Sequence, residues 1–139
     1  EAIRKTFKKE IDRAGYSQLN TLGLVATEAA YKDGSDWLED IKNYLWENVD
    51  FVREFLEQHL PEIKLIEPQG TYLLWLDFRS LRLSEEQLEN LVAVKAGLWL
   101  DSGAIFGGPG EGFERINIAC PRKTLQQALE KLEQAVKEL

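Results

Sequence analysis

Several residue types that often carry chemistry are scarce in this chain. It has no methionine, one cysteine and one histidine among 139 residues. The single Cys120 excludes an internal disulfide framework and fits a reducing cytoplasm, where we expect the protein to lie. Because His59 is the one histidine and Cys120 lies far along the chain, metal ligation has little support and no Ser-His-Asp arrangement can be assembled. We expect His59 to serve the end of a helix and Cys120 to be a buried, inert thiol.

Long apolar runs are also missing. No stretch approaches the roughly 18 residues needed to span a bilayer. Residues 1–13, EAIRKTFKKEIDR, are charged throughout and lack the apolar centre of a signal peptide. The net charge of −7 argues against nucleic acid as a main partner, because phosphate binding needs clustered Lys and Arg. We therefore expect no membrane and no nucleic acid among the partners.

The length and the start of the chain bound its organisation. At 139 residues it can form one compact domain with its own core, and it is too short for two ordinary ones. It begins at Glu1 and contains no methionine, so we expect a processed or excised piece of a longer protein. Removal of a tag would leave the same start.

Hydrophobic periodicity indicates alternating helices and strands. Helical spacing predicts helices over residues 1–13, 19–31, 36–60, from Ser84 onward and over 123–139. Alternation and flanking turns predict strands over residues 64–67, 71–78, 98–100 and 115–120. Ser35 is expected to cap the long helix, and Ser84 with Gln87 forms a capping box. Two long helices before the first strand favour an α+β fold.

The strand at 115–120 carries the first candidate site residues. With a period of two, Arg115 and Asn117 share one face, while the apolar Ile116 and Ile118 share the other. The planar fork of an arginine can hold a carboxylate through two parallel hydrogen bonds. An edge-strand arginine in a surface ion pair explains the same pattern. From spacing alone, both readings of Arg115 stay open.

A glycine-rich loop at 102–112, SGAIFGGPGEG, precedes that strand. No Lys-Ser or Lys-Thr follows it, and a strand comes next, which argues against a P-loop. Glycines there let the backbone pass close to a ligand or to a neighbouring segment. Glu111 and Glu114 are acid/base candidates in principle, and we expect both to be solvated surface residues.

Four segments together resemble a known family in order along the chain. They are LGLVATEAAY at 22–31, DWL at 36–38, QGTYLLWLDF at 69–78 and DSGAIFGGPGEGFERINIACPR at 101–122. This combination is similar to the C-terminal small domain of pyridoxal-phosphate (PLP) enzymes of the MalY/PatB cystathionine β-lyase type, within the class I/II aminotransferase superfamily. The last segment is the most specific, because a glycine-rich loop, an Arg-x-Asn strand and Cys-Pro-Arg occur together.

The resemblance implies a fold for this chain and places the cofactor site in another domain. It implies the small domain of PLP-dependent transferase fold type I, with a small, mostly antiparallel sheet packed with long helices. Residues 35–139 would form that domain, and residues 1–34 would lead in from a large cofactor domain. The lysine that forms a Schiff base with PLP would belong to that large domain. We therefore expect no catalytic and no cofactor-binding residue in this chain, which alone should be inactive.

Four residues take their expected roles from the resemblance. Arg115 would bind the α-carboxylate of an amino-acid substrate, with Asn117 beside it. Phe106 would touch substrate or simply pack. Tyr72 lies at a strand start that approaches the substrate side chain in related enzymes, and a buried tyrosine with a satisfied hydroxyl is the competing expectation.

For the complete enzyme, the resemblance implies a homodimer with PLP that carries out carbon–sulfur β-elimination on cystathionine- or cysteine-like amino acids. A PLP-dependent aminotransferase is the runner-up. A non-catalytic interaction module that keeps the fold is the second alternative.

Overall fold

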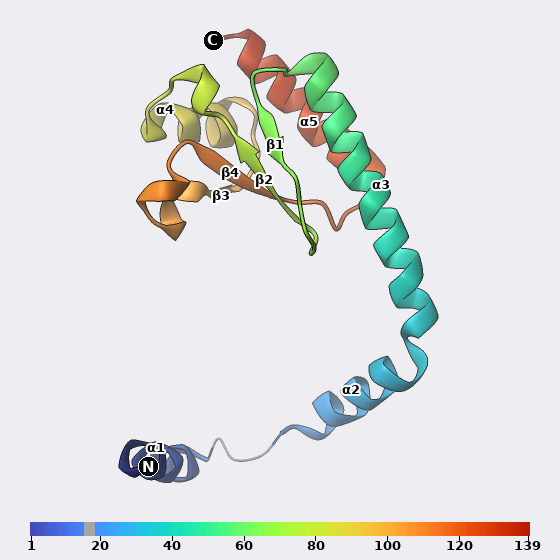
Figure 1. Cartoon of the computed structure of the whole chain (residues 1–139), viewed down its shortest axis with the longest axis vertical. Helices are drawn as coiled ribbons and strands as arrows, with labels where there is room; N and C mark the ends of the chain where they lie inside the picture. Colours follow the sequence, from blue (N-terminus) through green and yellow to red (C-terminus); the bar gives the residue numbers. More distant parts are fainter. Residues whose placement is uncertain (16–18) are drawn as a thin grey trace. The chain divides into compact units, whose positions relative to one another are not determined.

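A computed structural model describes residues 1–15 and 19–139, which form two compact units, Glu1–Ile41 and Lys42–Leu139. The α-helices are α1 (Ala2–Ala14), α2 (Thr21–Asp33), α3 (Ser35–His59), α4 (Glu85–Glu89) and α5 (Arg122–Lys137) (Figure 1). The strands are β1 (Lys64–Ile66), β2 (Leu73–Asp77), β3 (Asp101–Ser102) and β4 (Phe113–Asn117). The expected division into residues 1–34 and 35–139 stays a prediction. Its first segment includes residues 16–18, which lie outside the described residues.

The helices of the first unit are closed by local caps. Gly15 ends α1 in the left-handed conformation, with φ of 74°, which glycine adopts readily. At the start of α2 the Asn20 side chain accepts a hydrogen bond from the Gly23 amide at 2.6 Å. No residue of α1 or α2 is buried. Apolar side chains such as Ile3 and Leu22 are therefore exposed in the described unit.

The second unit is built on a four-stranded antiparallel sheet in the order β1-β2-β4-β3. In this register Arg115 of β4 lies opposite Trp75 on one side and opposite Asp101 on the other. The strand expected at 98–100 is wrong, because the pairing begins only at Asp101. Leu98 and Leu100 instead pack against the hydrophobic core. Antiparallel pairing throughout matches the predicted α+β class.

The core lies on one face of this sheet. Leu74 and Leu76 of β2 and Ile116 of β4 are buried, and so is Ile118 just beyond β4, as the alternation predicted. Helices α3 and α5 lie side by side against that face, and α4 with a following π-helical turn at Asn90–Lys95 completes the cover (Figure 1). The opposite face of β2 and β4 is only partly covered within the described residues.

Two predicted helix starts had different outcomes. Ser84 and Gln87 form the capping box, with the Ser84 amide donating to Gln87 Oε1 at 2.9 Å and the Gln87 amide donating to Ser84 Oγ at 3.3 Å. Ser35, by contrast, is the first residue of α3 rather than its cap. The Gly34 amide donates to the Ala30 carbonyl, so α2 ends directly where α3 begins.

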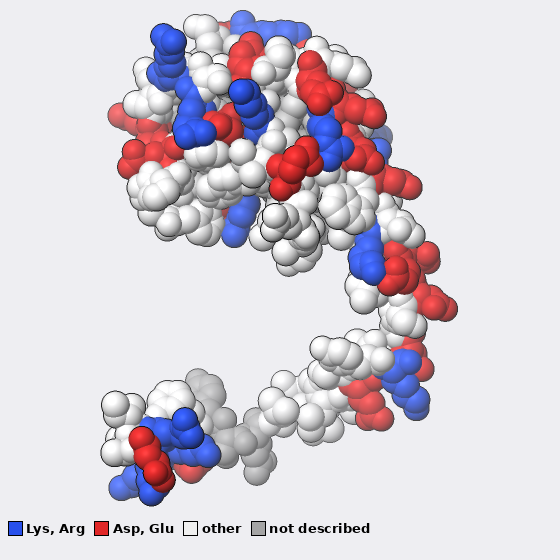
Figure 2. Space-filling model, viewed as in Figure 1, with Lys and Arg blue, Asp and Glu red and all other residues white. Residues whose placement is uncertain are grey.

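Charged side chains are spread over the surface. Figure 2 shows acidic and basic side chains interspersed on the visible face of residues 42–139, without a continuous basic area. Within residues 1–15 and 19–139, no helix combines the length and the apolar character needed to cross a membrane.

Candidate functional site

The partly covered face of the sheet contains the strongest candidate site. A pocket of about 460 Å³ opens there between the end of β1, the middle of β2 and β4, and the loop after β3. Its wall is largely apolar, and Arg115 supplies its one basic side chain. The lining residues are Ile66, Glu67, Pro68, Gln69, Gly70, Leu73, Trp75, Phe106 and Arg115. Such a pocket suits a small ligand held by one carboxylate.

Arg115 is held on two sides. Its Nε and Nη2 atoms donate to the same oxygen, Oδ2 of Asp101, at 3.1 and 2.8 Å. The Phe106 ring lies over the guanidinium, with 4.7 Å from Cζ to the ring centroid, and Trp75 meets that ring edge-on at 5.6 Å. The side chain remains 31% exposed. The ion pair foreseen as the alternative is thus present, and it lies at the rim of the pocket.

The loop that carries Phe106 is closed by two glycines in contact. A Cβ added to Gly103 would lie 2.1 Å from the Gly110 carbonyl oxygen, and one added to Gly110 would lie 2.1 Å from the Gly103 carbonyl oxygen. No other residue type fits at either position. Between them run two 3-10 turns, Gly103–Phe106 and Gly108–Gly110. The glycines therefore serve the close approach of a neighbouring segment, one of the two roles expected for the loop.

Asn117 shares the exposed face with Arg115, as the alternation predicted, but it has a local partner. Its Oδ1 atom accepts a hydrogen bond from the Ala119 amide at 2.8 Å, which shapes the chain where β4 ends. Asn117 does not line the pocket around Arg115. A substrate contact by Asn117 stays a prediction, in which its amide nitrogen would be the donor to a substrate carboxylate.

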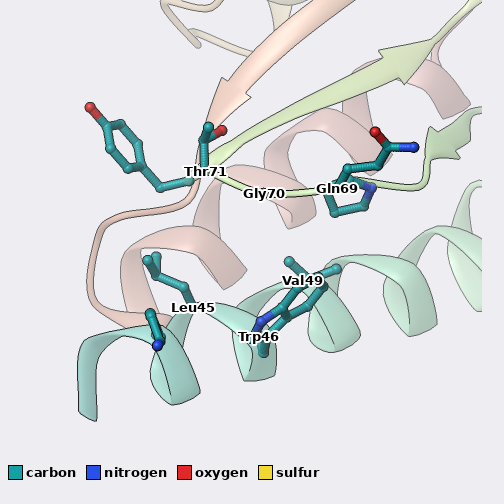
Figure 3. A pocket seen from close by; sticks show the side chains of 9 residues that line it. Leu45, Trp46, Val49, Gln69, Gly70 and Thr71 are labelled. Atoms are coloured by element: carbon teal, nitrogen blue, oxygen red, sulfur yellow. The ribbon is translucent and has the colours of Figure 1, made fainter. Parts of the chain in front are cut away.

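Tyr72 belongs to a different pocket, of about 300 Å³, between α3 and the segment 68–72. Figure 3 shows Leu45, Trp46 and Val49 of α3 facing Gln69, Gly70 and Thr71 across this space. Tyr72 is 47% exposed, so the expected burial of this tyrosine is wrong. Tyr72 lies just before β2, where its carbonyl still accepts a hydrogen bond from the Ile118 amide at 2.9 Å while its side chain stays exposed. Within this chain the structure does not bring Tyr72 into the Arg115 pocket.

Glu114 is the residue whose surroundings differ most from expectation. It was expected to be solvated, yet it is 3% exposed, whereas Glu111 is exposed as expected. Burial first, and then the charges of Glu85, Glu89 and Asp101, together raise the pKa of the Glu114 carboxyl to about 7. The same alternation that buries Ile116 turns Glu114 inward, so the signal was present in the sequence.

The remaining singled-out side chains serve structure. Cys120 is partly buried, and burial raises the pKa of its thiol, which disfavours the reactive thiolate. His59, the last residue of α3, stacks on Phe55 at 4.5 Å, and its Nδ1 atom lies 3.2 Å from Glu133 Oε1. Across the described residues, no group of three His, Cys, Asp or Glu side chains could hold a metal ion.

Comparison with known proteins identifies related sequences and structures. No protein-family model matches the chain. Cystathionine beta-lyase PatB of Bacillus subtilis is 35% identical over 133 residues, which cover 96% of this chain and 34% of PatB. Protein MalY of Escherichia coli is 33% identical over 125 residues, covering 90% of this chain and 32% of MalY. The chain thus spans about a third of the length of the curated relatives it matches, and the match is to their C-terminal part.

A solved structure shows the same fold. The crystal structure of cystalysin from Treponema denticola, which contains a pyridoxal 5'-phosphate cofactor, superposes with a TM-score of 0.90 at 39% identity. The superposition covers 99% of this chain and 35% of cystalysin. The predicted small domain of the aminotransferase fold, with its small antiparallel sheet, is therefore confirmed.

Proposed function

Since this chain belongs with the C-terminal small domains of the MalY/PatB-type cystathionine beta-lyases, we propose that it supplies the substrate-carboxylate arginine of a PLP-dependent carbon–sulfur lyase. One observation carries the proposal. Arg115 is the one basic side chain in a largely apolar pocket, and its guanidinium is held in place by Asp101 and Phe106. An arginine fixed in this way presents two parallel N–H groups to a carboxylate.

The residues of this chain would bind and orient the substrate. Arg115 would fix the α-carboxylate, and the apolar wall formed by Leu73, Trp75 and Phe106 would exclude water beside it. PLP, when bound, would supply the electron sink for chemistry at the α-carbon. None of the ten lysines here lies in a segment that resembles the cofactor lysine motif. That lysine, the phosphate-binding groups and the partner of the pyridinium nitrogen would come from a large domain preceding this one, in a homodimeric and cytoplasmic protein.

The expected substrates are cystathionine- or cysteine-like amino acids, with pyruvate, ammonia and a thiol as products. Transamination is the second candidate, because it requires the α-carboxylate to be bound in the same way. Product analysis separates the two: the lyase releases pyruvate from cystathionine without a keto-acid acceptor, and the aminotransferase requires the acceptor. A non-catalytic interaction module would bind no PLP even when joined to its large domain.

The first test removes the arginine. In the full-length protein that carries this domain, Arg115→Ala should lower kcat/KM for cystathionine by a factor of about 10² to 10³, corresponding to about 3–4 kcal/mol of lost transition-state binding through a charge-assisted pair. The absorbance of bound PLP should persist, because Arg115 is not expected to hold the cofactor.

Arg79→Ala is the matched control for that test. Arg79 also pairs with an aspartate, Asp77, and its Cζ lies 4.6 Å from the Phe113 ring centroid, but it lies outside the Arg115 pocket. Its kcat/KM should stay within about twofold of wild type. Equal losses of kcat/KM in the two variants would indicate that Arg115 is a surface ion-pair residue and does not bind the substrate.

A further inference from the structure

We propose that Asp101 is a positioning residue for Arg115. By occupying one edge of the guanidinium, Asp101 determines which edge is left to bind the substrate carboxylate. The inference deepens the proposed function and rests on it. It assigns a role to a side chain that the sequence pattern did not single out.

A guanidinium has five N–H donors arranged on three edges. Asp101 Oδ2 accepts from Nε and from Nη2 and thereby occupies the side edge of Arg115. Phe106 covers one face of the same group. What remains is the terminal edge, where Nη1 and Nη2 each keep a hydrogen that points the same way. A carboxylate can accept both of these in the parallel, two-bond geometry.

The backbone that carries Asp101 is held by neighbouring segments. Asp101 lies directly opposite Arg115 in the β3–β4 pairing, where side chains of neighbouring strands meet on one face. Immediately after β3, the Gly103–Gly110 contact closes the loop. The backbone of Asp101 is thus held by its pairing with β4 and by the closed loop that follows it. Holding a long arginine side chain in one orientation before the ligand arrives removes an ordering cost from binding.

The negative charge of Asp101 repels the substrate carboxylate and so weakens its binding. The hydrogen bonds from Arg115 to Asp101 orient the guanidinium and so strengthen that binding. These two effects can be separated, because asparagine keeps an acceptor oxygen at the same place without the charge. If positioning is the role of Asp101, Asp101→Asn should keep or improve carboxylate binding. Asp101→Ala should weaken it, because the guanidinium then becomes mobile.

The binding test uses propionate, a carboxylate without an amino group, as a competitive inhibitor of the full-length PLP-loaded enzyme. We expect Asp101→Ala to raise the inhibition constant for propionate at least fivefold and to raise KM for the amino acid similarly. We expect Asp101→Asn to give constants equal to or below those of wild type. Ethylamine, which has no carboxylate, should inhibit all three proteins equally.

Asp77→Asn is the matched control. Asp77 makes a two-bond pair with Arg79, at 2.9 and 2.8 Å, on the same sheet but outside the Arg115 pocket. Its propionate constant should not change. An unchanged or lower constant in Asp101→Ala would overturn the proposal, and so would an equal change in Asp77→Asn. If wild type shows no activity, or if Arg115→Ala binds propionate as well as wild type, the proposed function fails instead.

A second test needs no activity and uses the 139-residue chain. In the ¹⁵N-labelled protein, the Nε–H resonance of Arg115 should be protected from solvent exchange, because Asp101 accepts from it. The protection should persist in Asp101→Asn and be lost in Asp101→Ala. Equal protection in both variants would show that Asp101 does not fix the guanidinium, whatever the enzyme does.

Discussion

Asn48 and Glu114 are the two polar side chains buried within the described residues, 0% and 3% exposed, and their surroundings are opposite. Asn48, on α3, donates from Nδ2 to the carbonyls of Ile118 and Cys120, at 2.8 and 3.3 Å. Its Oδ1 accepts from Arg122 Nε at 2.6 Å. Both halves of the amide are therefore satisfied, and the side chain joins α3 to the end of β4 and the start of α5.

Glu114 is surrounded by acidic neighbours. The charges that act on it come from Glu85, Glu89 and Asp101, and no basic group is among the causes of its raised pKa. Glu85 itself is engaged elsewhere, because its Oε1 accepts from the Gly112 amide at 2.6 Å. A buried carboxylate without a cation is unfavourable, so the proton is retained to a higher pH.

The difference shows that burial alone does not decide what a polar group contributes to stability. A buried amide with every donor and acceptor engaged fixes how three elements meet. A buried acid among acids makes stability depend on pH. Four substitutions test this contrast, from the largest expected effect to the smallest.

Asn48→Ala should lower the free energy of unfolding by about 3–4 kcal/mol, because it leaves two carbonyls and Arg122 Nε without their partner and opens a cavity. Urea denaturation monitored by circular dichroism measures this. Asn43→Ala, an exposed position of the same helix, should change the value by less than about 0.5 kcal/mol. Equal effects at the two positions would contradict a special role for Asn48.

Glu114→Gln should change the pH dependence of stability. Because the folded-state pKa of about 7 lies above the ordinary 4.5, the folded protein keeps a proton that the unfolded chain releases, so stability falls as pH rises through this window. Removing the titration should stabilise the variant relative to wild type by about 3 kcal/mol more above pH 8 than below pH 4.

The measurement is the difference in unfolding free energy between variant and wild type at several pH values. Taking the difference cancels the titration of other groups. Glu111→Gln, at an exposed position nearby, should give a difference that does not vary with pH. A flat profile for Glu114→Gln would mean that the buried acid is compensated.

Tyr44→Phe should cost about 1 kcal/mol, because the Tyr44 hydroxyl accepts from the Arg122 amide at 2.7 Å and lies 3.4 Å from the Cys120 carbonyl. The loss should not add fully to that of Asn48→Ala, since both side chains contact Cys120. Tyr31→Phe, at an exposed position, should leave the urea midpoint unchanged. Full additivity would show that the two side chains act independently.

Glu89→Gln should have the smallest effect, a lowering of the Glu114 pKa toward its ordinary value, because one of three repelling charges disappears. A carbon-detected NMR titration of the Glu114 carboxyl measures it. Glu86→Gln, on the same helix but outside that charge group, should leave the titration in place. A larger shift in the Glu86 variant would overturn the assignment of neighbours.

Much of the fold could be predicted from local pattern. The helical spacing that predicts a helix over residues 36–60 and the capping box at Ser84 are short-range signals, and the structure confirms both elements. The alternation in β4 correctly separated Arg115 from Ile116. Glu114 lies one residue before the predicted strand at 115–120, so the prediction treated it as a solvated surface residue, whereas β4 begins at Phe113 and carries the alternation through Glu114 to the core face.

The pairing of Arg115 with Asp101 could not be predicted in that way. The two residues are 14 positions apart, and they meet only because β3 pairs with β4 in one particular register. The two-residue β3 has too little alternation to be recognised, and the strand expected at 98–100 was displaced by the packing of Leu98 and Leu100. The sequence pattern identified Arg115 as a candidate site residue, whereas its partner Asp101 is determined by the pairing of two strands.

The contact between Gly103 and Gly110 has a consequence for the conditions under which the pocket keeps its shape. The loop that holds Phe106 over Arg115 is closed by backbone that touches backbone, at a spacing no side chain could enter. A closure of this kind has no charge to titrate and none for salt to screen. We therefore expect Phe106 to stay over Arg115 at pH values and salt concentrations that weaken the ion pair between Arg115 and Asp101. A methyl group added at Gly103 or Gly110 would disrupt this closure, because the contact leaves no room for it.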